Sequence, residues 1–200
     1  LPVVPLDLRV DDTRLERALA TTGGHILFAF PAQSNFSGVQ HPLRRIKLAQ
    51  TRGWNVLLDA AALVPTNPLD LTRVHPDYVA LSFYKFSKMF AYPTGIGVLV
   101  ARHAALEKLH RPWFSGGNIT VASVQGSRHV LTEGAAAFED GTLHYTNIPA
   151  VDAGLTFLES VGLDVVHERA RCLTEWLLDA LVGRRQPSGR PAVNIYGPLT

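Results

Sequence analysis

Apolar residues gather in four short runs along the first half of the chain. The runs lie at 25–31 (HILFAFP), 54–59 (WNVLLD), 78–82 (YVALS) and 95–102 (GIGVLVAR). None of them alternates apolar with polar residues, a pattern typical of strands that are buried on both faces of a sheet. The sequence therefore predicts four buried strands.

Segments with helical spacing separate these runs. Short helices are expected at 13–22, 42–53, 67–74 and 103–109. Strands that alternate with helices indicate an α/β fold with a mostly parallel sheet. Only a short turn separates the third and fourth strands, so this pair is expected to be antiparallel.

From residue 148 onward the pattern changes to two long helices, followed by a loop at 184–192. The chain opens without Met on LPVVP and closes on VNIYGPLT, which is typical of a strand just begun. We therefore expect a piece of a longer protein, which on its own would bind a cofactor weakly or not at all.

Composition narrows the class of protein. Of the 200 residues, 46% are hydrophobic and 18% are charged, as in ordinary globular domains, and the net charge of +2 gives no argument for nucleic acid. No apolar run reaches the roughly 18 residues of a membrane helix. One cysteine excludes an internal disulfide framework, which favours a cytoplasmic location. The histidines lack the spacing of metal ligands, so no metal is expected.

Polar residues follow three of the predicted strands, at the ends where open α/β sheets bind ligands. They are Gln33, Ser34, Asn35 and Ser37 after the first strand, Asp59 at the end of the second, and Ser82, Tyr84 and Lys85 at the end of the third. A strand-end aspartate also caps turns, and an Asp–Lys pair can be purely structural, so these alternatives stay open.

One chemistry uses a lysine amine and a carboxylate together. Pyridoxal phosphate (PLP) forms a Schiff base with a lysine, while an acid facing its ring nitrogen keeps that nitrogen protonated. The lysine must be mobile and partly desolvated. Hydroxyls and backbone amides would hold the phosphate, for which Ser82, Tyr84 and the glycine-rich segments 94–97 and 115–117 are candidates.

Several blocks carry a family resemblance. They are FPAQSNFSGVQHPL, LLDAAALVPTNPLDL, HPDYVALSFYK, YPTGIGVLVAR, PWFSGG and FEDGTLHYTNIPA. The sequence resembles the class V aminotransferase fold, and within it the cysteine-desulfurase-like domain of molybdenum cofactor sulfurases. This implies a PLP-dependent transferase of fold type I that forms a homodimer and moves sulfur from L-cysteine to an acceptor. It also implies that 1–162 belong to the PLP-binding large domain and that 163–200 begin the small α+β domain.

The resemblance implies a role for six residues. Lys85 would carry the Schiff base, Asp59 would face the ring nitrogen, Asn35 would lie near the ring hydroxyl and the substrate, Ser82 and Tyr84 would contact the phosphate, and Thr142 would reach a phosphate across the dimer interface.

The family motif divides over two lysines. SFYK and its spacing from Asp59 select Lys85, whereas KMFAYPTG downstream selects Lys88. Three extra residues after the strand would account for both matches. Because the sheet pins the strand, its register favours Lys85, and Lys88 remains the alternative.

Cys172 is the only thiol of the chain and lies beside an apolar stripe of one helix face, made of Val166, Ala170, Leu173 and Leu177. A half-buried packing role is therefore expected for it, rather than a reactive one.

Two alternatives to a desulfurase stay open. Without a visible sulfur-accepting cysteine, another PLP-dependent reaction on the same fold stays open. The irregularity after Lys85 also leaves open a non-catalytic relic that serves as a dimerisation module.

Overall fold

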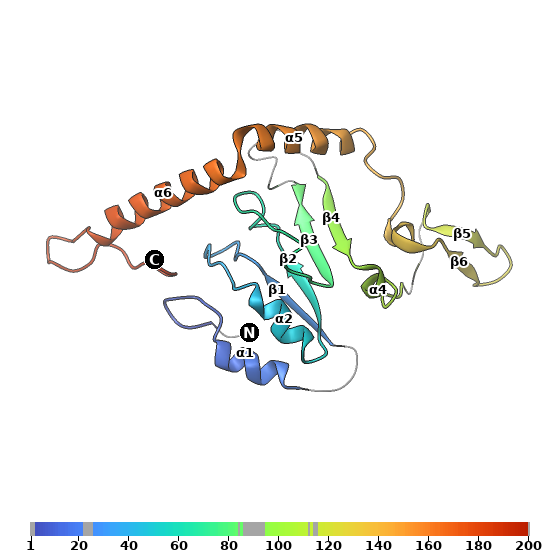
Figure 1. Ribbon diagram of the computed structural model, residues 1–200, viewed down its shortest axis with the longest axis horizontal. Coiled ribbons are helices and arrows are strands. Elements are labelled where there is room, and N and C mark those ends of the chain that lie inside the picture. The colour runs from blue at the N-terminus through green and yellow to red at the C-terminus, as the bar shows by residue number, and fades with distance from the viewer. Residues whose placement is uncertain are drawn as a thin grey trace.

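A four-stranded sheet forms the centre of the fold (Figure 1). The computed structural model describes residues 3–21, 26–83, 85, 95–111, 113 and 116–199. In chain order, the strands of the sheet are β1 (Leu27–Pro31), β2 (Asn55–Asp59), β3 (Tyr78–Ser82) and β4 (Gly97–Ala101). The first three are parallel, and β4 runs antiparallel to β3. The predicted strands and their directions are therefore confirmed.

Helices and a small hairpin are the other regular elements of the described chain. They are α1 (Asp12–Leu19), α2 (Arg44–Gln50), α4 (His103–Leu106), the 3-10 helix η1 (Gly134–Phe138), α5 (Ile148–Val161), α6 (Leu163–Val182), and the hairpin of β5 (Ile119–Ala122) and β6 (His129–Leu131). The helix predicted at 103–109 is shortened to the single turn of α4.

The helix predicted at 67–74 is wrong, because this segment forms turns. Asp70 provides the physical reason. Its carboxylate accepts hydrogen bonds from the backbone N–H of Thr72 at 2.8 Å and from the Thr72 hydroxyl at 2.6 Å. A side chain that bonds its own backbone two residues on stabilises a turn in competition with a helix.

The hydrophobic core lies on one face of the sheet. Phe28 and Phe30 of β1 are buried and stack with ring centroids 4.9 Å apart. Val56 and Leu58 pair with them in register from β2 and are fully buried. Helices close this face with Leu15 and Leu19 from α1 and Ile46 and Ala49 from α2. Helix α1 is capped by Asp11, whose Oδ1 accepts the backbone N–H of Arg14 at 3.1 Å.

The other face of the sheet is more exposed. Leu27 and Ala29 of β1 point to it and are exposed. The first four residues of β4, the last strand of the sheet, are exposed on both faces. The prediction that all strands are buried on both faces is therefore wrong for the part of the chain that the structure describes. The reason is that α1 and α2 pack into the same core, so they cover one side only.

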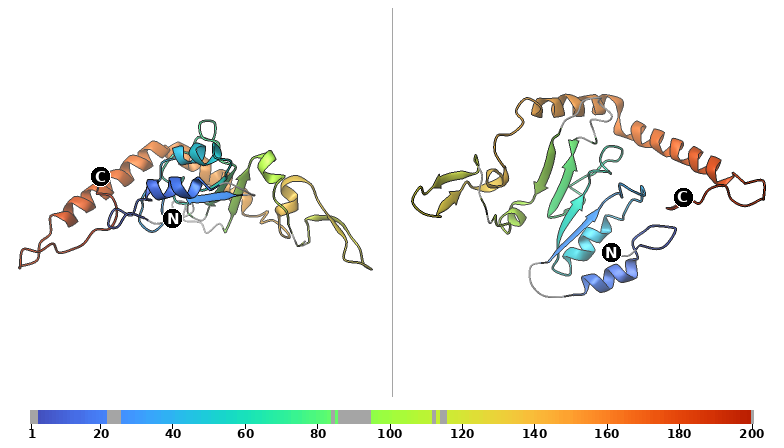
Figure 2. Two further views of the ribbon diagram at one scale, coloured as in Figure 1. Left: turned by 90° about the horizontal axis from the view of Figure 1, so that it is seen from below. Right: turned by 180° about the vertical axis from the view of Figure 1, so that it is seen from behind.

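Two long helices follow residue 148, as predicted. Gly162 separates them with a φ of +87°, a conformation that disfavours a side chain, and α6 departs from the direction of α5 there (Figures 1 and 2). No residue of α6 is buried, so Leu173 and Leu177 of the predicted apolar stripe are exposed rather than packed.

The end of the chain also differs from the prediction. Residues 193–199 form no strand. An extended segment needs a neighbouring strand to satisfy its backbone groups, and none pairs with this one among the residues described. In the whole part of the chain that the structure describes, no helix combines the length and the apolar character needed to cross a bilayer.

Candidate cofactor site

Three strands end at one edge of the sheet, because β1, β2 and β3 are parallel. Asp59 is the last residue of β2 and lies in register with Pro31, the last residue of β1. Ser82 ends β3 and is half-buried, and Lys85 follows shortly after it. The fold thus brings Asp59, Ser82 and Lys85 to the same edge as the loop that follows β1.

Lys85 and Asn35 are in direct contact. Lys85 Nζ donates a hydrogen bond to Asn35 Oδ1 at 3.1 Å, although the two residues lie 50 positions apart in the chain. The acceptor is a neutral amide, and no carboxylate among the described residues forms an ion pair with Lys85. A lysine held by a neutral acceptor is oriented without being fixed by an opposite charge, which suits an amine that must later be displaced.

The loop that presents Asn35 is fixed by Ser34. Its Oγ accepts the backbone N–H groups of Phe36 at 3.3 Å and Ser37 at 3.2 Å. The backbone N–H of Ser34 donates to the carbonyl of Val39 at 2.8 Å, which closes the loop. Asn35 therefore stands at the tip of a turn that is bonded on both sides.

Asp59 keeps most of its acceptor capacity. One oxygen, Oδ1, accepts the backbone N–H of Ala61 at 3.0 Å, so the turn-capping role that the sequence left open is realised. Within the described residues this is its only side-chain hydrogen bond, and no cation pairs with it. The carboxylate is exposed and can accept a further donor, as a protonated ring nitrogen requires.

Two other predicted residues cannot be placed. Tyr84 and Lys88 lie outside the residues that the structure describes, as do positions 94 and 115 of the glycine-rich segments. The choice between Lys85 and Lys88, and the phosphate role of Tyr84, therefore stay predictions.

Thr142 lies in an exposed loop between η1 and α5 and makes no hydrogen bond to Asn35, Asp59 or Lys85. The turn before it is held against the second glycine-rich segment, because Gly141 donates its N–H to the carbonyl of Gly116 at 3.0 Å. The bond joins the loop that carries Thr142 to the second glycine-rich segment at Gly116. The action of Thr142 on a partner subunit stays a prediction.

Cys172 is exposed, which corrects the expected half-buried position. Its Sγ donates to Glu168 Oε1 at 3.4 Å, and this hydrogen bond to a carboxylate raises the pKa of the thiol. Arg171 contacts the same carboxylate and lowers the pKa of Glu168 to about 2. A raised pKa disfavours the nucleophilic thiolate form, so this contact agrees with an unreactive thiol although the packing role expected for Cys172 is not realised.

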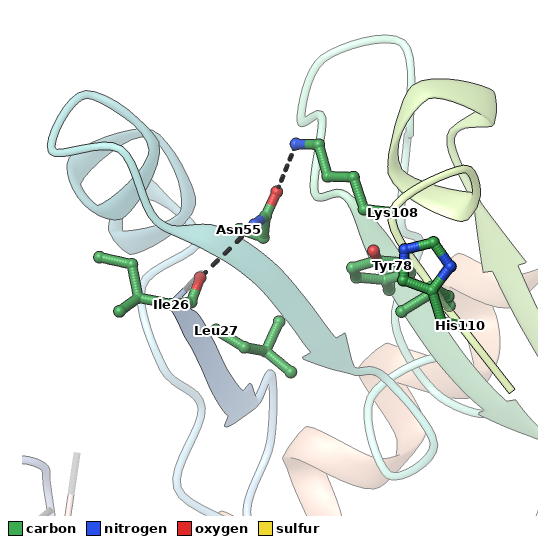
Figure 3. A pocket seen from close by; sticks show the side chains of 7 residues that line it. Ile26, Leu27, Asn55, Tyr78, Lys108 and His110 are labelled. Carbon is green, nitrogen blue, oxygen red and sulfur yellow. Dashed lines mark hydrogen bonds between the residues drawn. The ribbon is translucent and has the colours of Figure 1, made fainter. Parts of the chain in front are cut away.

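A hollow of about 520 Å³ lies at the opposite, amino-terminal end of the parallel strands (Figure 3). Three of its polar side chains are hydrogen-bonded within the protein. Lys108 Nζ donates to Asn55 Oδ1 at 2.9 Å, and Tyr78 Oη donates to the carbonyl of Ala105 at 2.6 Å. None of the predicted site residues lines it, so the Lys108–Asn55 pair offers a matched comparison for Lys85 and Asn35.

Comparison with known proteins now defines the family. The model of the family described as aminotransferase class-V matches residues 9–189. This chain belongs to the class-V aminotransferase family. Molybdenum cofactor sulfurases are similar to it: that of Caenorhabditis elegans is 36% identical over 86% of this chain, and that of Bos taurus is 35% identical over 98%. The chain spans 24% of the length of each of these two relatives.

Solved structures agree on the fold. The cysteine desulfurase CsdA of Escherichia coli is 26% identical, with a TM-score of 0.77 over 92% of this chain and 44% of its own. A cysteine desulfurase from Thermococcus onnurineus is 28% identical, with a TM-score of 0.70 over 92% of this chain and 46% of its own. The predicted fold, a partial PLP-dependent transferase of fold type I, is confirmed.

The residues at the strand ends fit PLP, the cofactor of this family. At one edge of the sheet the site offers the amine of Lys85, which has no ion pair within the described residues, and the carboxylate of Asp59, which has unused acceptor capacity. These are the two side chains that the cofactor needs. Among the residues described, no three His, Cys, Asp or Glu side chains gather as they would around a metal ion.

Proposed function

We propose that this chain forms the cofactor-binding part of a PLP-dependent cysteine desulfurase of the molybdenum cofactor sulfurase type, with Lys85 as the cofactor lysine. The observation that carries the proposal is the bond from Lys85 Nζ to Asn35 Oδ1 at the edge of the sheet where Asp59 ends β2. The similarity to molybdenum cofactor sulfurases supports the choice of reaction.

Each residue has a defined task. PLP, when bound, supplies an electron sink for the bond that breaks at the alpha carbon of the substrate. Lys85 would hold the cofactor through Nζ, and the same amine, once free, would move a proton at the alpha carbon. Asp59 would hold a proton on the ring nitrogen through its unused acceptor capacity. Asn35 orients Lys85 Nζ and would lie near the ring hydroxyl.

The finer assignments form part of the proposal. The substrate is L-cysteine, and its sulfur passes to an acceptor. The active form is a homodimer in which Thr142 contacts the phosphate bound to the partner. The large domain ends at Gly162, where the change of direction between α5 and α6 supports a boundary, and 163–200 begin the small domain.

A second PLP-dependent reaction on the same fold is the alternative. Cys172 is the only thiol in these 200 residues, and its hydrogen bond to Glu168 raises its pKa. A lyase or aminotransferase would need no such thiol. A non-catalytic relic would instead leave Lys85 unreactive toward the cofactor.

Reductive trapping tests the proposal. The chain is mixed with excess PLP, reduced with borohydride, digested and mapped by mass spectrometry. Four lysines compete, Lys47, Lys85, Lys88 and Lys108, and we expect the adduct on Lys85. Lys108 is the internal control, because its Nζ is bonded to an asparagine oxygen in the same way but at the other end of the sheet. Equal labelling of all four lysines would favour the relic, and an adduct on Lys88 would move the cofactor lysine there.

A comparison of L-cysteine with D-cysteine tests the proposed substrate. L-cysteine added after free PLP has been removed should displace Lys85 and lower the trapped yield, whereas D-cysteine, which reacts equally with any free cofactor, should not. An equal effect of the two enantiomers would contradict L-cysteine as the substrate. A larger effect of another L-amino acid would select the second reaction.

A further inference from the structure

Gln40 joins two loops at the cofactor edge of the sheet. Its Nε2 donates to Gln33 Oε1 at 3.2 Å, within the loop that follows β1, and to Asn67 Oδ1 at 3.2 Å, in the segment that follows β2. Asn67 is itself held, because its Nδ2 donates to Thr66 Oγ1 at 2.9 Å and to the carbonyl of Leu63 at 3.3 Å. One amide group thus spans both segments.

The first of these loops is the one that presents Asn35. Gln33 and Gln40 also face each other as an antiparallel bridge at its base, so the loop is a closed unit with Asn35 at its tip. Gly38 allows the return with a φ of +72°. The bond from Gln40 to Asn67 is a side-chain tie between this closed loop and the neighbouring segment.

The tie lies on the wall of a pocket of about 520 Å³ between these loops and α6. Gln33, Gln40 and Asn67 all line this pocket, and Gln40 is exposed. The Gln40 side chain is therefore not part of the hydrophobic core. Its hydrogen bonds connect two surface loops, so we assign them to the positioning of the Asn35 loop.

We propose that Gln40 is a positioning residue: by tying the Asn35 loop to the segment after β2, it holds Asn35 Oδ1 at the Nζ of Lys85. The proposal deepens the proposed function, in which Lys85 is the cofactor lysine, and rests on it for its catalytic meaning. Gln40 itself touches neither Lys85 nor Asp59.

The test measures Lys85 without any cofactor. The rate at which an amine-reactive acylating reagent labels Lys85 is followed by peptide mapping, with Lys47 and Lys108 quantified in the same digests. The bond to Asn35 must break before Nζ can attack the reagent, so Asn35→Ala should speed labelling by about 2- to 10-fold, the range of one net hydrogen bond. Gln40→Met should act in the same direction, and so should Asn67→Ala.

Two comparisons separate positioning from a general loss of structure. Gln40→Met should add nothing further in a chain that already carries Asn35→Ala, because the contact it maintains is then gone. Gln40→Lys, which retains donors on a long side chain, should restore the slow rate. Gln50→Met is the matched control: Gln50 also donates twice, to the carbonyl of His75 at 2.8 Å and to Asp77 Oδ2 at 3.1 Å, but away from the Asn35 loop.

The outcomes are decisive in each direction. Faster labelling of Lys85 in Gln40→Met, lost in the Asn35→Ala background and absent in Gln50→Met, supports the proposal. An unchanged rate, or an equal increment in the Asn35→Ala background, overturns it. Reductive trapping with PLP is a separate experiment, so a failure of the cofactor assignment would not be mistaken for a failure of Gln40.

Discussion

Asp12 and Arg45 form an ion pair whose removal should have an asymmetric effect on stability. Arg45 Nε and Nη2 both donate to Asp12 Oδ1, and Nη2 also donates to the carbonyl of Val10 at 3.3 Å. The Arg45 side chain is only 5% exposed, whereas that of Asp12 is 53% exposed. Asp12 also contacts Arg44 at 3.5 Å, and that side chain is 71% exposed.

The magnitude follows from these exposures. Breaking a fully buried ion pair by removing one partner costs about 3–5 kcal/mol, because a buried charge is left without a counter-ion. An exposed pair is worth about 0–1 kcal/mol. The pair between Asp12 and Arg45 is buried on one side only, so Asp12→Ala should lower the free energy of unfolding by about 2 kcal/mol, with part of the loss coming from the first turn of α1. Arg44→Ala, which removes the exposed arm, should cost less than about 0.5 kcal/mol.

Urea unfolding monitored by circular dichroism measures both values, provided that the slopes agree between variants. A double variant, Asp12→Leu with Arg45→Met, removes the buried charge together with its counter-ion and should be more stable than Asp12→Ala alone. If Asp12→Ala cost no more than Arg44→Ala, or if the double variant were the least stable of the three, the idea that the buried guanidinium depends on Asp12 would be refuted.

Three further predictions concern stability. Burial, and next the charge of Arg45, lower the pKa of His41. The unfolded chain therefore binds a proton at this histidine at a higher pH than the folded chain does, so the free energy of unfolding should fall as the pH drops below about 6.5. Urea titrations at pH 7.5 and 5.5 should show a smaller loss of stability between the two pH values in His41→Leu than in the unmodified chain. Gly117→Ala should cost about 1–2 kcal/mol, because its φ is +92° and a Cβ would lie 3.3 Å from a backbone oxygen, whereas Gly126→Ala, free of a positive φ, should be nearly neutral by the same assay. Leu58→Ala should cost about 3 kcal/mol, since the side chain is fully buried; a loss below about 1 kcal/mol would contradict its place in the core.

The strands were predictable from sequence because each is a short apolar run ended by polar residues. Their one-sided burial was not predictable, because Leu27 and Ala29 look as apolar as Phe28 and Phe30 until the side on which α1 and α2 pack is known. Local chemistry could have corrected the helix expected at 67–74. The Asp70-x-Thr72 pattern carries its own signal for a side-chain-closed turn.

The site divides in the same way. Strand ends and family resemblance together singled out Asn35, Asp59 and Lys85, and the fold brings Asn35 into contact with Lys85. Gln40 carries no such signal. Its partner Asn67 lies 27 positions away in the segment after the next strand, so their contact depends on the pairing of β1 with β2 and cannot be read from local spacing.

The position of Lys85 follows from the same pairing. Leu58 and Asp59 of β2 lie in register with Val79 and Ala80 of β3, and Ser82 is paired on its other side with Gly97 of β4. A shift of one residue in β3 would turn the buried Val79 out of the core, so both neighbours oppose a change of register. Lys85 lies three residues after this fixed end of β3. The register of β3 therefore supports the proposal that Lys85 is the cofactor lysine.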